Sequence, residues 1–308
     1  MTLPSPAPSR ASSEEPDDAV ITERLQALAR EAQASRTPYI RDDSERYGIF
    51  CRAISNVLST ELALFTLAQI IDGLPTADVA WDKRASDLDA DHPIEEHSTL
   101  CPVVMDRARE FRQSSDPDIL SFDPKLLRPF QQAPKGSRLF NIRLIEMVAV
   151  AVHDIGAFVF QLDLRMHQGD IKAVEQWTNA PPDSPWAKLV ATRPTLFYHA
   201  YYFGADVYPR GVADMVGYWA ENRILGGVTV FDRQAEERAP ESPPNVYFSS
   251  IRARVSVNYY QLVDDQQQAL LDFLLAENPD ECQSPLPILG DERNRVKVDF
   301  ERAIDQHI

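Results

Sequence analysis

Four polar residues are spaced along one otherwise apolar stretch of the sequence. Glu146 and His153 lie seven residues apart, Asp154 follows the histidine directly, and Gln161 lies a further seven residues on. A spacing of seven places side chains on one face of a helix, two turns apart. Because burying an unpaired polar group costs about 1–3 kcal/mol, these side chains must pair, contact water or line a cavity. A histidine beside carboxylates is also a candidate for acid–base catalysis.

Two interpretations of these residues stay open at this point. The side chains could hydrogen-bond between helices and fix the packing, or they could line a ligand-binding or catalytic pocket beside the helix. For a pocket, we predict that His153 and Asp154 are catalytic and that Glu146 and Gln161 bind a ligand.

A second group of candidates lies in an aromatic segment. Residues 196–203 read Leu-Phe-Tyr-His-Ala-Tyr-Tyr-Phe, which puts several phenol hydroxyls close to the imidazole of His199. Aromatic rings with a few polar tips are typical of pockets for flat organic molecules, although the same residues could form a packed seam between two parts of the protein. We predict His199 as a catalytic residue. The ligand-binding residues predicted here are Tyr198, Tyr202, Trp219 and Glu221.

One short string resembles a known metal-binding motif. Residues 152–156 read Val-His-Asp-Ile-Gly, which is similar to the central motif of HD-domain metal-dependent phosphohydrolases. The resemblance implies a divalent metal on His153 and Asp154, with an upstream histidine and a downstream aspartate. The sequence departs from that pattern, since Ala157 follows the glycine in place of a basic residue. The candidates for the remaining ligands are His92, His97, Asp206 and Asp214.

Other motifs that would assign a chemistry do not occur. The sequence has no glycine-rich nucleotide loop, no Gly-x-Ser-x-Gly elbow, no His-Glu-x-x-His and no Cys-x-x-Cys. The three cysteines, Cys51, Cys101 and Cys282, are odd in number and widely spaced, which argues against a disulfide framework and favours reduced thiols in the cytoplasm. The sequence identifies no cofactor and selects no metal ligand.

The charge balance restricts the partners. The chain has 47 acidic against 31 basic residues, for a formal charge of −16. Such a charge opposes binding to nucleic acids and to anionic membrane surfaces. No signal peptide or long apolar run is present in the sequence, so we predict a cytoplasmic protein without a membrane segment.

The apolar periodicity predicts a mainly helical α+β protein. The stretch 137–167 is apolar on nearly every face, which is typical of a buried central helix. Alternation typical of a half-buried strand is clearest over 251–259. We therefore predict a disordered tail at 1–18, a helical body at 19–225, and a mixed part at 226–308 with a small antiparallel sheet packed on that body. The predicted helices are 21–34, 43–72, 98–113, 137–167, a short one at 170–177, 210–224 and 265–276.

Several stretches between residues 140 and 300 together resemble an expanded group of filamentous-fungal proteins. No activity is established for that group, so the resemblance implies no catalytic residue. It associates the chain with specialised metabolism. The stretches are 153–156, 163–165, 194–199, 211–214, 217–221, 224–228, 261–262, 268–275 and 285–289.

The leading hypothesis is a small-molecule pocket between the central helix and the aromatic segment. The protein would then serve as an accessory or tailoring factor in specialised metabolism. One alternative is a protein-interaction or scaffold module without catalysis, which would bind a protein partner or a second copy of itself through the strand at 251–259. The other alternative is the HD-like phosphohydrolase.

Overall fold

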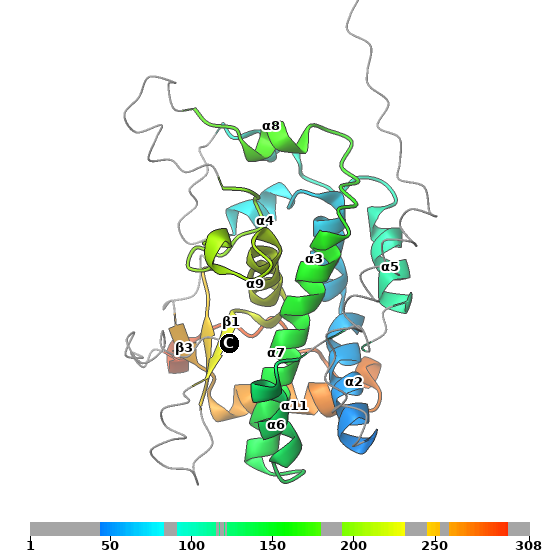
Figure 1. Cartoon of the computed structure of the whole chain (residues 1–308), viewed down its shortest axis with the longest axis vertical. Coiled ribbons are helices and arrows are strands. Elements are labelled where there is room, and N and C mark those ends of the chain that lie inside the picture. The colour runs from blue at the N-terminus through cyan, green and yellow to red at the C-terminus, as the bar shows by residue number, and fades with distance from the viewer. Residues whose placement is uncertain are drawn as a thin grey trace, which may run out of the picture.

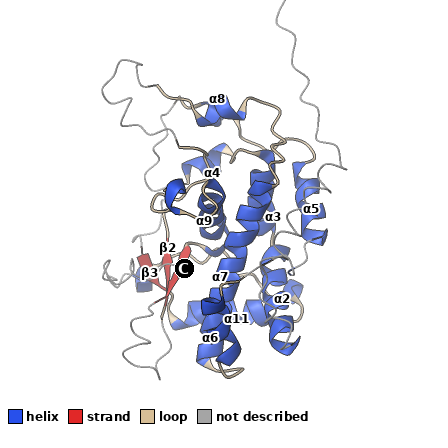
Figure 2. Ribbon diagram, viewed as in Figure 1, coloured by secondary structure: helices blue, strands red, loops and turns tan. Residues whose placement is uncertain are grey.

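The computed structural model describes residues 44–82, 91–114, 117, 120, 122–179, 193–231, 245–252 and 259–294. The predicted tail at 1–18, the helix at 21–34 and most of the strand at 251–259 lie outside these residues. Within them the protein is mainly helical with one small antiparallel sheet, so the predicted fold class is confirmed (Figure 2).

The helices follow one another along the chain and the sheet comes late. The α-helices are α2 (Ser44–Ser59), α3 (Glu61–Asp72), α4 (Ala77–Trp81), α5 (Val104–Ser114), α6 (Pro124–Gln132), α7 (Arg138–Gln161), α8 (Ile171–Glu175), α9 (Val212–Leu225) and α11 (Asp264–Leu275). The strands are β1 (Val228–Phe231), β2 (Val246–Ser249) and β3 (Tyr259–Gln261). They pair in the order β1-β2-β3, with Thr229 opposite Phe248 and Phe248 opposite Tyr260.

Helix α7 is the central element, as its composition predicts. It runs along the length of the molecule, from α6 at one end to the segment before α8 at the other (Figure 1). The Ser137 hydroxyl caps its first turn by accepting the Phe140 amide at 3.1 Å. Apolar residues bury it on several sides, and one continuous core joins it to the other helices and to the sheet.

The central helix ends six residues earlier than predicted. Helical geometry stops after Gln161, and Asp163 and Arg165 adopt left-handed backbone angles, with φ of 52° and 42°. The backbone N–H of His167 then donates to the carbonyl of Asp72 at 2.8 Å. This pairing with the end of α3 replaces the hydrogen bonds that a longer α7 would make, because each backbone amide has one proton to donate.

The long helix predicted at 43–72 is also interrupted. It divides into α2 and α3, which are bent by 75° at the break. The Thr60 hydroxyl accepts the Ala63 amide at 3.1 Å, which begins a new helix at that point. Among the described residues, no single helix is long and apolar enough to cross a membrane. Within those residues, α2 and α3 meet the length and composition required when they are taken together as a bent pair.

Small residues bring α7 and α9 into close contact. A side chain at Gly156 would have its Cβ 2.7 Å from the Cβ of Ala220. At Gly217, a Cβ would lie 2.8 Å from both the ring and the backbone carbonyl of His153. These glycines therefore set the distance at which the two helices cross, and the His153 ring lies directly on α9.

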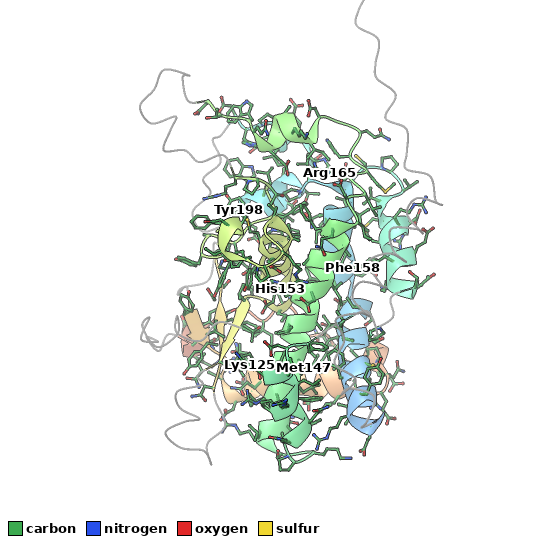
Figure 3. All side chains as sticks on the ribbon, viewed as in Figure 1. Lys125, Met147, His153, Phe158, Arg165 and Tyr198 are labelled. Carbon is green, nitrogen blue, oxygen red and sulfur yellow. The ribbon has the colours of Figure 1, made fainter. Side chains whose placement is uncertain are left out.

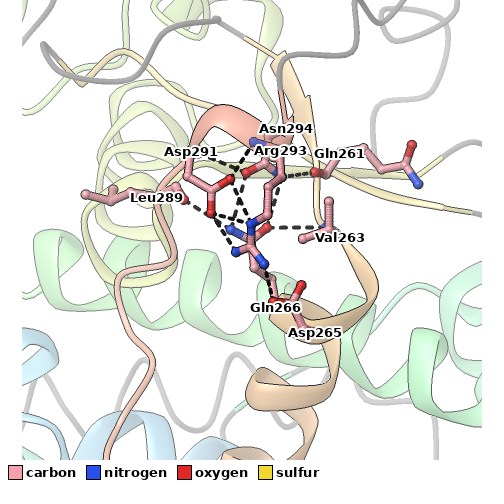
Figure 4. A network of polar contacts seen from close by, with 8 residues as sticks. All are labelled: Gln261, Val263, Asp265, Gln266, Leu289, Asp291, Arg293 and Asn294. Atoms are coloured by element: carbon pink, nitrogen blue, oxygen red, sulfur yellow. Dashed lines mark hydrogen bonds and ion pairs between the residues drawn. The ribbon is translucent and has the colours of Figure 1, made fainter.

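A polar network holds the last described residues beside α11 (Figure 4). Asn294 accepts the Asp291 amide at 2.9 Å, and its own amide donates to Gln266 Oε1 at 2.9 Å and to the carbonyl of Gln261. Arg293 donates to Asp291 at 2.6 Å on the exposed side. These contacts tie the end of the described chain to β3 and to the first turn of α11.

Candidate functional site

A charged network joins α7 to α9 near the middle of the molecule. His153 Nε2 lies 3.1 Å from Asp214 Oδ1. The Arg210 Nε donates to the same oxygen at 2.7 Å, and the Arg210 backbone amide donates to Asp214 Oδ2 at 2.8 Å. A second nitrogen of Arg210 donates to Asp154 at 2.5 Å. We call His153, Asp154, Arg210 and Asp214 the α7–α9 network.

The positions of these four residues follow from the course of α7 and from the way α9 begins. His153 lies about midway along α7, on the side of α9 (Figure 3). Asp214 is in the first turn of α9, where a carboxylate is favoured by free amides and by the helix dipole. Arg210 lies four residues before Asp214, just ahead of Gly211, which begins the helix at a φ of 60°.

Arg210 is the cation that both carboxylates of this network share. Burial acts to raise the pKa of Asp214, but hydrogen bonds from His153 and from the Arg210 backbone lower it to about 2. Asp214 is therefore ionised at neutral pH and accepts the Nε2 proton of His153. In neutral imidazole this leaves Nδ1 as the basic nitrogen, which is the arrangement of a general base oriented by a carboxylate.

The network does not form the metal site that the HD motif implies. Arg210 bridges Asp154 and Asp214, and its guanidinium supplies the positive charge that a metal would bring to these carboxylates. His92 accepts the Ile94 amide through Nδ1, and His97 lies against Asp72 instead. Within the described ranges, no group of three or more ligand side chains close enough to share an ion includes His153 or Asp154.

The two predicted groups of site residues meet through stacked aromatic rings. The His153 ring lies edge-on to Tyr218 with centroids 4.4 Å apart, and Tyr218 stacks on Tyr202 at 4.6 Å. Tyr202 in turn lies 4.9 Å from His199, and Tyr208 lies 5.3 Å from Tyr218. Sequence reasoning missed Tyr218, Arg210 and the pairing of Asp214 with His153. Arg210, Asp214 and Tyr218 are spaced by four residues at the start of the helix predicted over 210–224, and this spacing was the signal that could have found them.

His199 has a position that suits packing better than catalysis. It is fully buried, its Nδ1 accepts the Tyr201 amide at 3.2 Å, and its Nε2 lies 3.2 Å from the carbonyl oxygen of Ser249. Since Nδ1 accepts, Nε2 carries the proton and donates to that carbonyl. Both ring nitrogens thus bind the backbone and fix the aromatic segment to β2, so we do not propose His199 as a proton-transfer group.

Glu221 is a buried acid between α9 and β1. Burial raises its pKa to about 8, although the Thr229 amide donates to its Oε1 at 2.6 Å and lowers the pKa in part. Its charge would also act on Tyr202 and Tyr218, whose pKa values are raised mainly by burial and further by Glu221. Glu221 is therefore mainly the neutral acid at neutral pH, and it lies near enough to Tyr202 and Tyr218 for its charge to raise their pKa values when it ionises.

The remaining predicted residues lie around this centre or away from it. Trp219 is buried against Phe197 at 4.7 Å, and the Tyr198 ring lies 3.8 Å from the Arg193 guanidinium. Glu146 forms a buried ion pair with Arg143 at 2.8 Å within α7, which is a packing role. Gln161 is exposed at the end of α7, about two turns beyond His153.

A second histidine–aspartate cluster lies where α3 and the segment after α7 meet. Asp72 Oδ2 lies 2.9 Å from His97 Nε2 and 3.7 Å from His167 Nδ1. The Cys101 sulfur is 3.4 Å from His167 Nδ1. We call Asp72, His97, His167 and Cys101 the Asp72 cluster. The sequence offered His97 only as a candidate ligand beside His153 and Asp154, whereas in the fold it lies with Asp72 and His167, and these three side chains are close enough to hold one ion.

Comparison with known proteins adds no relative. The chain matches no family model, no curated protein and no solved structure. The geometry of the two clusters is therefore the guide to the function of the chain.

Proposed function

We propose that the α7–α9 network and the rings beside it bind a small planar molecule that carries an anionic or carbonyl oxygen. The observation that carries this proposal is a histidine whose Nε2 is fixed by an ionised aspartate while its side chain stays 12% exposed. A histidine with only a packing role has no need of a charged orienting partner at the surface. This ligand class suits an accessory or tailoring role in specialised metabolism.

Arg210 supplies the site for the oxygen of the ligand. Its guanidinium binds Asp154 and Asp214, yet the side chain is 34% exposed, so its outer edge faces solvent beside His153. A guanidinium that is already held by two carboxylates loses little further freedom when it binds an anion. A carboxylate or enolate oxygen is the group that such an edge recognises.

The aromatic residues supply the flat surface. Tyr218 and Tyr208 are half-buried next to His153, and the segment just before α9 exposes three large apolar side chains. Exposed apolar groups beside a charged network are typical of a binding surface for an organic molecule. These three exposed side chains are Tyr201, Phe203 and Val207.

The reaction that this arrangement supports is removal of a proton next to a carbonyl group. His153 Nδ1 would take the proton, Asp214 would stabilise the resulting imidazolium, and Arg210 would pair with the enolate oxygen. The proton returns from the imidazolium to the carbon, so the exchange is balanced and needs no added reagent.

Two measurements on the full chain test this function. Saturation-transfer NMR with a panel of aromatic carboxylates and aryl ketones should detect binding that falls at least about tenfold in His153→Gln and Arg210→Met. Bound ketones should exchange their α-protons with D₂O in a reaction that His153→Gln abolishes. His167→Gln is the matched control, because its histidine also contacts an aspartate but lies in the Asp72 cluster. A panel without binders, or equal binding by all variants, would contradict the proposal.

The structure favours neither alternative function. The phosphohydrolase would need a metal at carboxylates that Arg210 already bridges. The interaction module was based on the strand at 251–259, of which residues 253–258 lie outside the described part of the chain.

A further inference from the structure

We propose that the Asp72 cluster binds a divalent transition-metal ion, Zn²⁺ foremost, through Asp72, His97 and His167, with Cys101 in reach as a fourth ligand. The site is separate from the α7–α9 network, and its existence does not depend on the function proposed there.

The ligand atoms are grouped at the right distances. One oxygen or nitrogen from each of Asp72, His97 and His167 lies within 4.8 Å of the other two. Ligands about 2.0–2.2 Å from a tetrahedral Zn²⁺ are roughly 3.3–3.6 Å from one another, and the observed separations of 2.9 and 3.7 Å lie on either side of that range. Small side-chain movements would place an ion between them.

Asp72 is a buried carboxylate whose partners are incomplete. Its side chain is 0% exposed, and the polar groups that approach its oxygens within the described ranges are His97, His167 and Cys101, none of them in an ordinary hydrogen-bond geometry. His97 Nε2 is such a group, although it lies 2.9 Å from Asp72. Such close atoms without an aligned proton are what two ligands of one ion show, because their lone pairs point at a common position and not at each other.

Among the described residues, no permanent cation pairs with Asp72. In the part of the chain that the structure describes, its ion-pair partners are the two histidines, and no lysine or arginine pairs with it. A buried carboxylate is normally matched by a charge or a metal, since burial of an isolated charge is strongly unfavourable. A divalent ion would provide that charge.

Backbone hydrogen bonds fix the segments that carry the ligands. His167 donates its N–H to the carbonyl of Asp72 at 2.8 Å, and the carbonyl of His97 accepts the Ala77 amide at 2.8 Å. Gly73 follows Asp72 with a φ of 103° and ends α3 there. The His167 ring is held from the other side, because a Cβ at Gly169 would lie 2.7 Å from its Nε2. Nδ1 of His167 is therefore the nitrogen that faces Asp72 and Cys101.

The donor set determines the class of metal. Two imidazoles and one carboxylate suit Zn²⁺, Fe²⁺ or Co²⁺, whereas Mg²⁺ and Ca²⁺ prefer sites built of oxygens. The thiol of Cys101 lies 3.4 Å from His167 Nδ1 and is half-buried. If the thiol loses its proton and binds, all four positions of a tetrahedral ion are filled, which is typical of structural zinc sites.

The test is metal binding by the purified full chain after treatment with a chelator. Calorimetric titration with ZnCl₂ should show one equivalent bound, and His97→Gln and His167→Gln should each weaken binding at least about tenfold. His153→Gln is the matched control and should bind as the wild type does, because Arg210 already balances that histidine–aspartate pair. Circular dichroism of each variant verifies that it is folded.

Cobalt gives a second readout that does not depend on affinity. The Co²⁺-loaded chain should show the visible bands of a tetrahedral ion and a thiolate charge-transfer band that Cys101→Ser removes. A wild type that binds no Zn²⁺ at micromolar concentration would overturn the proposal. So would binding that survives both His97→Gln and His167→Gln, because the ion would then lie elsewhere.

Discussion

Two histidine–aspartate clusters in the described part of the chain differ in how their charge is balanced. In the α7–α9 network, Asp214 contacts His153 and also Arg210, which extends to Asp154. In the Asp72 cluster, the buried carboxylate contacts two histidines and no arginine or lysine of the described chain. The same residue types therefore suit different tasks. In the α7–α9 network Arg210 pairs with the carboxylates, so the proposed role of His153 is proton transfer. In the Asp72 cluster no such cation is present among the described residues, and the proposed occupant is a metal ion.

The two clusters also differ in access to solvent. Arg210 is 34% exposed and His153 12%, so a molecule can approach the α7–α9 network from outside. Asp72 is 0% exposed, which suits an ion that is captured once and retained. Non-glycine residues with left-handed backbone angles lie near the second cluster, at Val103, Asp163 and Arg165. Backbone strain of this kind persists where the surrounding structure fixes a segment.

The largest predicted effect concerns Glu221, the buried acid between α9 and β1. Its pKa of about 8 in the folded state stands against an ordinary value of 4.5. The folded state thus holds the proton more tightly, so this stabilisation is complete below about pH 4.5 and is lost as the pH rises through 8. One pH unit corresponds to about 1.4 kcal/mol. Between pH 5 and 8, the free energy of unfolding of the wild type should therefore fall by roughly 4 kcal/mol more than that of Glu221→Gln.

Urea unfolding at several pH values measures this difference. Glu110→Gln, an exposed acid on α5, is the control and should follow the wild type. Parallel pH profiles for wild type and Glu221→Gln would mean that Glu221 is already ionised in the folded protein. The pKa of about 8 for Glu221 in the folded protein would then be wrong.

The second largest predicted effect is stabilisation by Zn²⁺, which distinguishes the Asp72 cluster from the α7–α9 network. Zn²⁺ at a hundred times its dissociation constant should stabilise the wild type by about 2.7 kcal/mol, since a ligand that binds only the folded state shifts unfolding by mass action. His167→Gln should gain little from the same Zn²⁺ concentration, whereas His153→Gln should gain the full amount. Unfolding in urea with and without ZnCl₂ measures all three. Equal stabilisation of the three proteins would remove the distinction between the clusters.

Arg210 is the residue on which the charge balance of the α7–α9 network depends. Arg210→Met leaves Asp154 and Asp214 without their shared cation. Removing one partner of a buried pair costs about 3–5 kcal/mol, but Arg210 is a third exposed, so we expect a loss of about 1–2 kcal/mol. Arg210→Lys keeps the charge without the two-armed geometry and should lose less. Thermal unfolding compares them, and a loss as large in Arg210→Lys would show that packing decides the effect.

The sequence predicted the fold class because apolar periodicity is a local property. The apolar stretch at 137–167 identified the central helix, but its end depended on the carbonyl groups of α3 that accept the amides of Met166 and His167. No pattern inside that stretch contains this information. The break between α2 and α3 was local, and Thr60 as a capping residue could have indicated it.

The candidate site was predicted in part for the same reason. His153 and Asp154 are neighbours on a helix, and the aromatic segment is visible as composition. Arg210, Asp214 and Tyr218 repeat every four residues, so they could also have been found. The Asp72 cluster could not, because Asp72, His97 and His167 come from three segments that only the folded chain brings together.

The smallest predicted effect tests whether helix spacing sets the geometry of the α7–α9 network. A methyl group at Gly217 would meet the ring and the backbone carbonyl of His153 at 2.8 Å, so α7 and α9 must move apart by a few tenths of an ångström. Overpacking costs about 1–3 kcal/mol, and alanine regains nearly 1 kcal/mol as the better helix former.

The free energy of unfolding of Gly217→Ala in urea should therefore be only about 1 kcal/mol lower than that of the wild type, yet the substitution should displace His153 from Asp214. NMR of the His153 ring nitrogens would report that displacement, while Zn²⁺ binding at the Asp72 cluster should stay as in the wild type. An unchanged His153 signal would mean that Arg210 and Asp214 hold the histidine without help from the helix contact.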